Sequence, residues 1–458
     1  MKCGKIFMNK EKDANKMKID LPEKVKQIIE TIQAAGFEAY AVGGCVRDSL
    51  LGRVPNDWDI TTSAKPEQVK ELFPRTIDTG IQHGTVTVML QKEGFEVTTY
   101  RIDGKYEDSR HPKEVTFTAS LTEDLKRRDF TINAMAYNEA EGLIDVFGGR
   151  EDMEKKRIRC VGEAKERFSE DALRMMRAVR FSAQLGYEIE EKTKEAIKEL
   201  APTLKKISAE RIQVELVKLV VSPHPDYLRT AYETGITAVV LPEFDRMMEA
   251  EQHNPHHCYT VGEHTLHAMQ NIEADKVLRL AMLFHDVGKP DTTTIDEEGV
   301  CHFYGHPELG MEMARVILRR LKFDNDTLYK VIKLVRFHDY NIAPTPKGMR
   351  RAIFKIGEDI MPLLFPVKQA DMLAQSSFQR EEKQEKLDTL KALYEKVLAE
   401  RDCVSLKTLA VTGSDLIAAG MKPGKEIGEV LDRLLQMVID TPECNTKEYL
   451  LAQAAKFI

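Results

Sequence analysis

Residues 38–63 read EAYAVGGCVRDSLLGRVPNDWDITTS, and they combine two short β-rich runs with a glycine turn and an acidic pair. The pair is Asp57 and Asp59, two residues apart in the second run. Alternate residues of a strand point to the same face, so the two carboxylates should converge, about 6–7 Å apart along the backbone. Carboxylates this close repel each other unless one keeps its proton or a divalent cation neutralises them. The spacing therefore predicts that Asp57 and Asp59 bind Mg²⁺.

The turn Gly43-Gly44 precedes the acidic pair by 13–15 residues, and Arg47 follows it. Such a turn lets backbone N–H groups approach a triphosphate, and two Mg²⁺ ions roughly 4 Å apart serve nucleotidyl transfer. An isolated Asp-x-Asp is more often a solvated strand end, but the turn upstream favours a phosphate site. Glu96, in the run FEVTTY, is either a third carboxylate of this site or a solvent-facing strand residue.

Periodicity divides the chain into a mixed α/β head and a long helical body. Residues 21–36 have apolar side chains at helical spacing, and β-rich runs continue through 84–90 and 95–102. From about residue 120 helical periodicity dominates, with two or three helices expected over 163–220. We therefore predict an α+β protein with an elongated all-α body. The predicted domains are a catalytic head, a helical neck, a helical body and a helical tail, over residues 21–150, 151–222, 223–380 and 381–458.

The 458 residues are 42% hydrophobic and 31% charged, which is ordinary for a soluble globular protein. No apolar run is long enough for a membrane span, and the basic N-terminus has no apolar signal core. The seven cysteines are scattered without a Cys-x-x-Cys pair, so we expect a cytoplasmic protein. The net charge of −7 argues against a uniformly basic nucleic-acid binder, but phosphate binding depends on where the cations lie. Local basic clusters occur at 126–128 and 155–157.

Three runs, in this order, resemble the signature of the tRNA nucleotidyltransferase and poly(A) polymerase family. They are GGCVRDSLLGRVPNDWDITTS at 43–63, LKRRDFTINAMAYN at 125–138 and RFSEDALRMMRAVRF at 167–181. The similarity spans roughly residues 35–222 and implies a nucleotidyltransferase head. In the family the second run lines the ribose and closes the nucleotide pocket, which implies that role for Arg128, Asp129 and Asn133. The residue chemistry alone leaves a second interpretation open, in which Asp129 caps a helix beginning near Thr131.

The third run is predicted to be one helix in which Asp171 and Arg174 lie on one face, with Arg177 and Arg180 adding positive charge further along. An acid–base pair at this spacing is commonly a surface salt bridge. Cytosine and adenine both present an amine donor beside a ring-nitrogen acceptor, so a carboxylate and a guanidinium fit them and reject guanine and uracil. The family uses this helix as an amino-acid template for CTP and ATP. The resemblance implies that role for Asp171 and Arg174, and we predict that Arg177 and Arg180 also bind the nucleotide.

The run DGKYEDSRHPKEV at 103–115 resembles the flexible loop that the family needs for the final A addition. The resemblance implies that Arg110 in this loop is catalytic. Relatives commonly have Arg-Arg-Pro where this chain has Arg110-His111-Pro112, which leaves the role of His111 open. The presence of the loop favours complete CCA addition over CC addition alone.

Nine of the twelve histidines fall within residues 253–338. The run LRLAMLFHDVGKP is predicted to be an apolar helix ending at Gly288 and Pro290, which would bury His285 and Asp286. Buried imidazole and carboxylate groups need a partner, and a metal ion would supply one. The order of residues resembles the HD-domain metal-dependent phosphohydrolases, which implies a two-metal site for Ni²⁺, Mn²⁺ or another divalent ion. The implied ligands are His264, His285, Asp286, His306, His338 and Asp371.

Together the resemblances imply template-independent addition of CCA to the 3′ end of tRNA, using CTP and ATP and releasing pyrophosphate. They also imply a phosphohydrolase or cyclic phosphodiesterase in the HD domain. One alternative is a poly(A) polymerase of the same family, which usually has a basic C-terminal extension where this chain is acidic. Another is an HD-type nucleotide hydrolase with a regulatory transferase-like head, although known alarmone enzymes place the HD domain first. A non-catalytic RNA-binding relic would be expected to have lost the carboxylates, which are intact. We expect tRNA, CTP and ATP as partners, and neither a membrane nor an obligate protein partner.

Overall fold

The structure, a computed structural model, describes three stretches of the chain, 18–104, 115–253 and 259–456. The chain divides into two compact units. They are residues 1–212 with 233–240, and residues 213–232 with 241–458. Within the described stretches, no helix is both long and apolar enough to cross a membrane.

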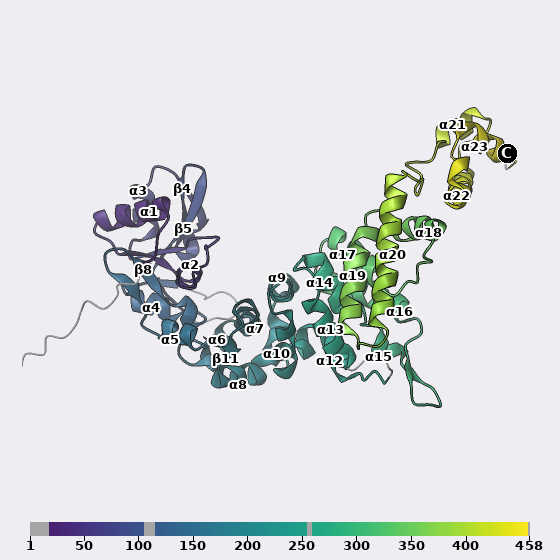
Figure 1. The fold of residues 1–458 in the computed structure, drawn as a ribbon. Helices are drawn as coiled ribbons and strands as arrows, with labels where there is room; N and C mark the ends of the chain where they lie inside the picture. Colours follow the sequence, from purple (N-terminus) through teal and green to yellow (C-terminus); the bar gives the residue numbers. More distant parts are fainter. Residues whose placement is uncertain (1–17, 105–114, 254–258, 457–458) are drawn as a thin grey trace, which may run out of the picture. The chain divides into compact units, whose positions relative to one another are not determined.

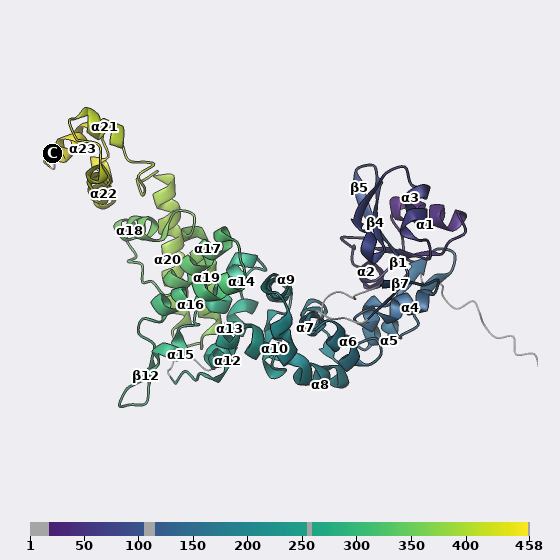
Figure 2. The same ribbon diagram turned by 180° about the vertical axis from the view of Figure 1, so that it is seen from behind.

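The first unit is built on a seven-stranded mixed sheet (Figures 1 and 2). Its strands are β1 (Ala39–Val42), β2 (Ile60–Thr62), β3 (Thr76–Gly80), β4 (Thr85–Leu90), β5 (Glu93–Thr99), β8 (Ala136–Asn138) and β9 (Gly142–Ile144). The strand order is β3-β4-β5-β2-β1-β8-β9. Only β2 and β5 pair in parallel in this sheet as described, and the other neighbouring pairs are antiparallel. The interior strand β1 is buried along its whole length, as its continuous apolar sequence requires.

Helix α1 (Glu23–Ala34) packs against β1 and β2 beside the short helix α3 (Pro66–Leu72). Its buried residues are Val25, Ile28, Ile29 and Ile32, and each such burial contributes about 1.5–3 kcal/mol. The remaining short elements of the head are α2 (Gly44–Leu50), α4 (Leu121–Lys126), α5 (Gly149–Glu154), β6 (Arg101–Asp103) and β7 (Val115–Phe117). The predicted mixed α/β head is therefore confirmed, although the sequence analysis did not identify β3, β8 or β9.

Four α-helices occupy residues 163–220, where two or three were predicted. They are α6 (Ala164–Glu170), α7 (Leu173–Leu185), α8 (Glu191–Leu200) and α9 (Ala209–Val220). The predicted single helix through residues 170–177 is wrong, because the chain is extended at Asp171, with φ −141° and ψ 103°. The Asp171 carboxylate accepts a 3.0 Å hydrogen bond from the Leu173 N–H, a local bond that competes with helix continuation.

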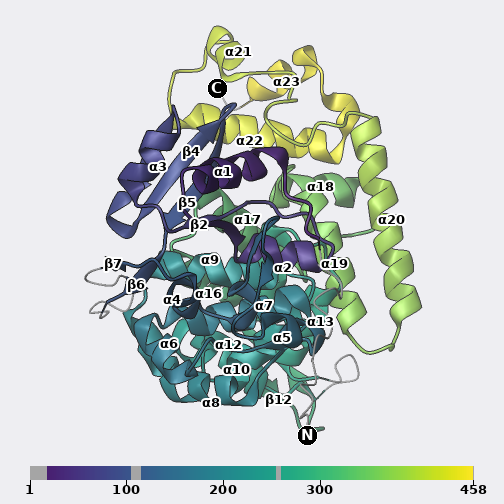
Figure 3. The same ribbon diagram turned by 90° about the vertical axis from the view of Figure 1, so that its left-hand side faces the viewer.

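The second unit is helical. Its main helices are α12 (Pro242–Glu249), α13 (Val261–Gln270), α14 (Lys276–Phe284), α15 (Lys289–Thr292), α16 (His306–Arg320), α17 (Asn325–Phe337), α18 (Pro346–Ile356), α19 (Met361–Ala374), α20 (Arg380–Ala399), α21 (Gly413–Ala418), α22 (Lys425–Asp440) and α23 (Lys447–Ala454). Helices α13, α14, α17 and α19 pack around a common core, while the long α20 lies against α18 and α19 (Figure 3). Helix α14 ends at Phe284, earlier than predicted, because Gly288 and Pro290 begin the separate short helix α15.

Candidate functional site

Asp57 and Asp59 lie in the extended stretch directly before β2, not within the strand as predicted. The Asp59 carbonyl accepts a 3.0 Å hydrogen bond from the Val42 N–H at the end of β1. The pairing between β1 and the β2 segment ends there, because the chain turns away at Gly43, which has a φ of +85°. Strand β5 runs parallel to β2 and carries Glu96 to the same place. All three carboxylates line one cavity of about 800 Å³, which we call the acidic cavity.

The carboxylates of the acidic cavity act on one another electrostatically. Desolvation raises the pKa of Asp59 above its ordinary value, Arg128 opposes the rise, and Asp57 adds to it. Desolvation also raises the pKa of Glu96, and both aspartates contribute. A divalent cation would relieve this repulsion, and carboxylate oxygens are the donors that Mg²⁺ prefers. The donor set therefore fits Mg²⁺.

The glycine turn lies against Arg128. Helix α2 begins at Gly44, and a Cβ atom at Gly43 would come within 2.9 Å of Arg128 Nη1. Only glycine combines that close approach with the left-handed backbone at this position. The Arg128 guanidinium also pairs with the buried Asp124 at 3.6 Å, and its charge acts on Asp59. The glycine turn, the Arg128 guanidinium and the acidic cavity are therefore neighbours, an arrangement that suits the binding of a triphosphate.

A chain of hydrogen bonds joins the predicted nucleotide-binding residues of α2 and α7. Arg47 Nη1 donates to Asn133 Oδ1 at 2.7 Å, and Asn133 Nδ2 donates to Asp129 Oδ1 at 3.2 Å. Arg177 donates to Asp129 Oδ2 through Nε at 2.8 Å and Nη2 at 2.5 Å. The alternative cap role of Asp129 is wrong, because the one-turn helix Thr131–Asn133 has no side-chain cap. Asp129 instead anchors the network.

The Asp129–Arg177 pair gives a stability prediction. Burial alone would raise the pKa of Asp129, but Arg177 lowers it below its ordinary value. The pair's stabilisation is therefore present above the unfolded-state pKa of about 3.9 and is lost as the pH falls through the folded-state pKa. Arg177→Ala should lower the free energy of unfolding of the first unit by about 3 kcal/mol at pH 7, because Asp129 stays buried without its partner.

Urea unfolding at pH 7 and at progressively lower pH measures this difference, which should shrink as the solution becomes more acidic. Lys155→Ala is the matched control, because Lys155 makes only an exposed pair with Glu151, worth about 0.5 kcal/mol or less. An Arg177→Ala penalty as small as that of the control would show that Asp129 does not depend on Arg177.

The predicted base-reading residues have separate partners in the structure. Asp171 accepts hydrogen bonds from Arg211 at 2.7 and 3.3 Å. Arg174 donates to Glu170 Oε2 at 2.5 Å and to the Arg167 carbonyl at 3.1 Å. The sequence analysis missed Arg211, which lies forty residues from Asp171 and has no local signal. Asp171 and Arg174 nevertheless both lie at the start of α7, which begins at Leu173.

Of the two remaining predicted site residues, the structure describes Arg180 but not Arg110. Arg180 is buried at the far part of α7, where its Cζ lies 3.8 Å from the centre of the Phe181 ring and Nη1 donates to Gln184. Arg110, predicted to be catalytic, and the neighbouring His111 lie outside the described residues.

The helices of the second unit bring the six predicted metal ligands together. They are His264 on α13, His285 and Asp286 directly after α14, His306 at the start of α16, His338 directly after α17, and Asp371 on α19. Gly288 permits this approach, because a Cβ atom there would lie 2.5 Å from the His306 carbonyl oxygen. Five of the ligands are buried and Asp371 is half-buried. We call this group the histidine cluster.

The histidine cluster has two halves that share Asp286. In one half, His264 Nε2 lies 2.9 Å from Asp371 Oδ1 and 3.2 Å from His285 Nε2. His285 Nε2 in turn lies 3.2 Å from Asp286 Oδ2. In the other half, His306 Nε2 lies 3.3 Å from His338 Nε2. Both of these Nε2 atoms lie 3.5 Å from Asp286 Oδ1.

Backbone carbonyls fix the tautomer of the cluster's imidazoles. The Nδ1 atoms of His285, His306 and His338 lie 2.6, 2.7 and 2.7 Å from carbonyl oxygens three residues earlier in the chain. A carbonyl only accepts, so each Nδ1 carries the proton and each Nε2 presents a lone pair. The Nε2 lone pairs of His306 and His338 face each other at 3.3 Å, and His285 Nε2 lies 3.2 Å from His264 Nε2, so a cation between each pair of rings would be well placed. The donor set therefore fits two divalent metal ions.

Lys289 and Gln252 extend the cluster beyond the predicted residues. Lys289 Nζ lies 2.7 Å from Asp286 Oδ2 and donates to Gln252 Oε1 at 2.9 Å. Burial would raise the pKa of Asp286, but His285 and Lys289 lower it well below the ordinary value. Lys289 stands three residues after Asp286 in the same turn, a spacing that could have identified it.

The mixed sheet, the glycine turn and the acidic cavity define a nucleotidyltransferase, to which a helical unit with a candidate two-metal centre is joined. Residues 39–159 match the Poly A polymerase head domain, 186–248 match the probable RNA and SrmB-binding site of polymerase A, and 300–454 match a tRNA nucleotidyltransferase domain 2. The chain belongs to the CCA-adding enzyme family.

Relatives that match almost the whole length of the chain support that family assignment. The CCA-adding enzyme of Lactobacillus helveticus is 38% identical over 432 residues, which cover 93% of this chain and 96% of the relative. That of Enterococcus faecalis is 37% identical, with 95% and 97% covered. The crystal structure of the Bacillus stearothermophilus CCA-adding enzyme in complex with CTP matches with a TM-score of 0.70 and 33% identity, covering 94% of this chain and 96% of that one.

Proposed function

We propose that this protein adds the sequence CCA to the 3′ end of tRNA, using CTP and ATP and no nucleic-acid template. The acidic cavity beside the glycine turn supports the proposal, in a chain that belongs to the CCA-adding enzyme family. The reaction joins the tRNA 3′-hydroxyl oxygen to the α-phosphorus of the nucleotide, and the bond to the departing pyrophosphate breaks. We place it in the cytoplasm, where tRNA, CTP and ATP are available.

The residues take distinct parts in this proposal. Asp57 and Asp59 would hold Mg²⁺, which when bound neutralises the triphosphate and polarises the α-phosphate. Arg128 and the Gly43 turn would orient the triphosphate, because they lie beside the acidic cavity. The network from Arg47 through Asn133 and Asp129 to Arg177 would position the ribose.

The test is to incubate the protein with a tRNA that ends at the discriminator base, together with CTP and ATP, and to size the product. Exactly three added nucleotides, C, C and A, are expected. A long A tail would instead identify a poly(A) polymerase, and no extension would leave the head a regulatory or RNA-binding module.

Arg174→Ala should relax base selection more than it slows chemistry. Arg174 stands at the start of α7 with its charge held by Glu170, and the proposed role is to read the base, not the phosphate. Misincorporation of UTP or GTP relative to CTP should rise by a factor equivalent to about 1–3 kcal/mol. Single-turnover assays with each nucleotide measure it, with the exposed Arg150→Ala as control. An equal loss for all four nucleotides would reduce Arg174 to a structural ion pair with Glu170.

We further propose that the second unit is a metal-dependent phosphohydrolase that opens 2′,3′-cyclic phosphates. The support is the convergence of all six predicted ligands, with lone pairs that fit two divalent ions such as Ni²⁺ or Mn²⁺. When bound, such ions polarise a phosphoryl group and activate water. Water then adds to phosphorus, one P–O bond to the ribose breaks, and the released ribose oxygen takes a proton. A tRNA ending in a cyclic phosphate cannot accept a nucleotide, so this activity would restore a substrate for the head.

A further inference from the structure

Two cavities open onto the histidine cluster. One has a volume of about 470 Å³ and the other about 590 Å³. Their linings share His338, Asp339, Asp371 and Gln375, so the cluster lies where the two cavities meet. A ligand larger than a single phosphate group would have space on both sides of these shared residues.

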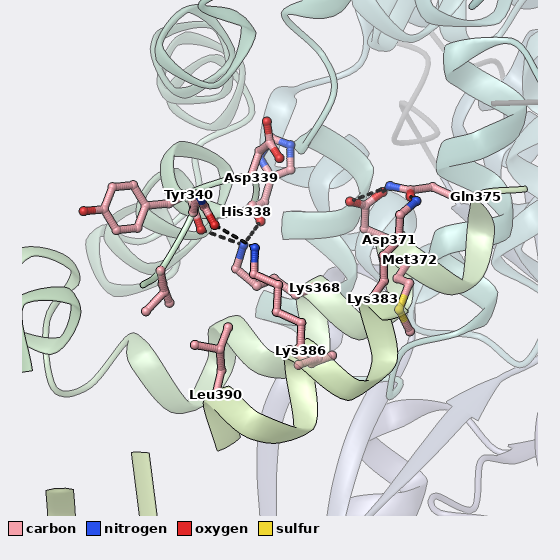
Figure 4. A pocket seen from close by; sticks show the side chains of 13 residues that line it. His338, Asp339, Tyr340, Lys368, Asp371, Met372, Gln375, Lys383, Lys386 and Leu390 are labelled. Atoms are coloured by element: carbon pink, nitrogen blue, oxygen red, sulfur yellow. Dashed lines mark hydrogen bonds between the residues drawn. The ribbon is translucent and has the colours of Figure 1, made fainter. Parts of the chain in front are cut away.

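The smaller cavity, which we call the lysine pocket, is lined by Lys368, Lys383 and Lys386 (Figure 4). Lys368 Nζ donates to the carbonyl oxygens of His338 at 2.7 Å and Tyr340 at 3.0 Å, which ties it to a cluster ligand. An ammonium group has three N–H donors, so these bonds leave one for a ligand. Both acceptors are neutral; burial lowers the pKa of Lys368 to about 8, while the nearby Asp339 and Asp371 favour its charged form.

The other two lysines come from α20. Lys383 donates to Gln375 Oε1 at 2.7 Å, and the amide of Gln375 lies 3.3 Å from both carboxylate oxygens of Asp371. Lys386 donates to Asn341 Oδ1 at 2.8 Å. Figure 4 shows Lys383 beside Gln375 and Asp371, with the Lys368 and Lys386 side chains on the other side of the pocket. Three lysines thus surround a space that begins at the cluster, and the carboxylates of Asp339 and Asp371 line its side nearest the cluster ligands.

The uncharged linings of the two cavities also suit a nucleotide strand. The lysine pocket includes the apolar side chains of Met372, Leu387 and Leu390, against which a sugar or base can pack. In the larger cavity, the Tyr304 ring stacks on His302 with centroids 5.4 Å apart and planes 7° apart, and Tyr304 is 77% exposed. An exposed aromatic face beside a phosphate site is a common platform for a base.

We propose that the histidine cluster acts on the 3′ end of an RNA chain and not on a free mononucleotide, with the terminal nucleoside on the Tyr304 side and the preceding backbone phosphates in the lysine pocket. A mononucleotide has one nucleoside and fills one side of the cluster, whereas a strand end uses both. This inference rests on the proposed phosphohydrolase for its chemistry, but the binding it requires is independent of turnover.

Binding is measured by fluorescence anisotropy, in chelator without added metal, with a 5′-labelled tetraribonucleotide that ends in a 3′-phosphate. The double variant Lys383→Gln/Lys386→Gln should weaken binding at least tenfold, because two phosphate contacts are lost. The matched control is Lys391→Gln/Lys396→Gln, two lysines of the same helix that do not line the pocket, and its Kd should stay within twofold of wild type. Thermal unfolding of each variant verifies that it is folded.

Hydrolysis provides the second readout, with Mn²⁺ or Ni²⁺ added. The ratio of kcat/KM for a tetraribonucleotide ending in a 2′,3′-cyclic phosphate to that for a 2′,3′-cyclic mononucleotide should be at least 10 in wild type and fall about tenfold in the Lys383/Lys386 variant. Equal kcat/KM for the two substrates in wild type, or RNA binding unchanged by the double variant, would overturn the inference. Lysine-dependent RNA binding without hydrolysis of either substrate would support the strand-binding cleft while refuting the phosphohydrolase.

Discussion

Asp59→Asn should lower the rate of both C and A addition by at least about a thousandfold, as loss of a catalytic metal ligand does. Asp57→Asn should have the same effect. The two carboxylates line the acidic cavity with Glu96, and the charge of Asp57 adds to the raised pKa of Asp59, a repulsion that a bound cation would relieve. Rates are measured by single-turnover extension of a tRNA lacking CCA, at saturating CTP and then ATP.

Binding of tRNA, measured by filter retention, should hardly change in these variants, because the carboxylates would face the metal and not the RNA backbone. Asp78→Asn is the matched control, since Asp78 is an exposed head carboxylate that pairs with Lys70. Retention of more than a few per cent of transfer activity in either active-site variant would exclude that residue as a metal ligand.

Asp286→Ala should abolish metal-dependent hydrolysis of 2′,3′-cyclic nucleotides, with a loss of at least about a thousandfold. Asp286 offers one carboxylate oxygen to each half of the histidine cluster, so its removal affects both proposed metal positions at once. Binding of Mn²⁺, followed by calorimetry, should be lost in parallel. Addition of CCA to an intact tRNA should persist, because the two proposed sites use separate ligands in separate units.

Asp286 is buried, so its replacement can also disturb folding, and Asp286→Asn serves as a second variant of nearly the same shape. Asp291→Ala is the control, because Asp291 is a partly exposed carboxylate of α15 that pairs with Arg246. The assay compares several divalent ions on a cyclic nucleotide and on a phosphomonoester. If the wild type turns over neither substrate with any ion, or if the variant matches it, the cluster has a structural role.

Local pattern predicted those parts of the fold whose burial is regular along the chain. Strands β1, β4 and β5 and helix α1 each bury one side or both, and their sequences show it. Strands β8 and β9 have three residues each, too few to establish a period, and they join the sheet because β8 pairs with the distant β1 and β9 pairs with β8. The break at Asp171 was missed because a helical pattern does not reveal a side chain that bonds back to the following turn.

The candidate sites divide in the same way. The ligands of the histidine cluster were predicted because their order resembled a known family; the structure gathers five of them into two groups whose ligand atoms lie within 4.8 Å of one another, and Asp371 lies 2.9 Å from His264. The sequence did not predict a role for Arg211, Lys383 or Lys386, because their importance follows from which helices pack together and not from any local spacing. The sequence of α20 predicts a highly charged helix, but it does not say that α20 meets a cavity beside Asp371.

The carbonyls that hold the imidazoles of the histidine cluster belong to the last turn before each ring, so the ligand geometry is part of the helix ends themselves. An ion that binds there is therefore linked thermodynamically to the integrity of α14 and α17. It binds the folded unit and not the unravelled helix ends, and at a hundred times its Kd it would add about 2.7 kcal/mol to the unit's free energy of unfolding. The concentration of free metal ion would then affect the stability of the second unit as well as its proposed activity.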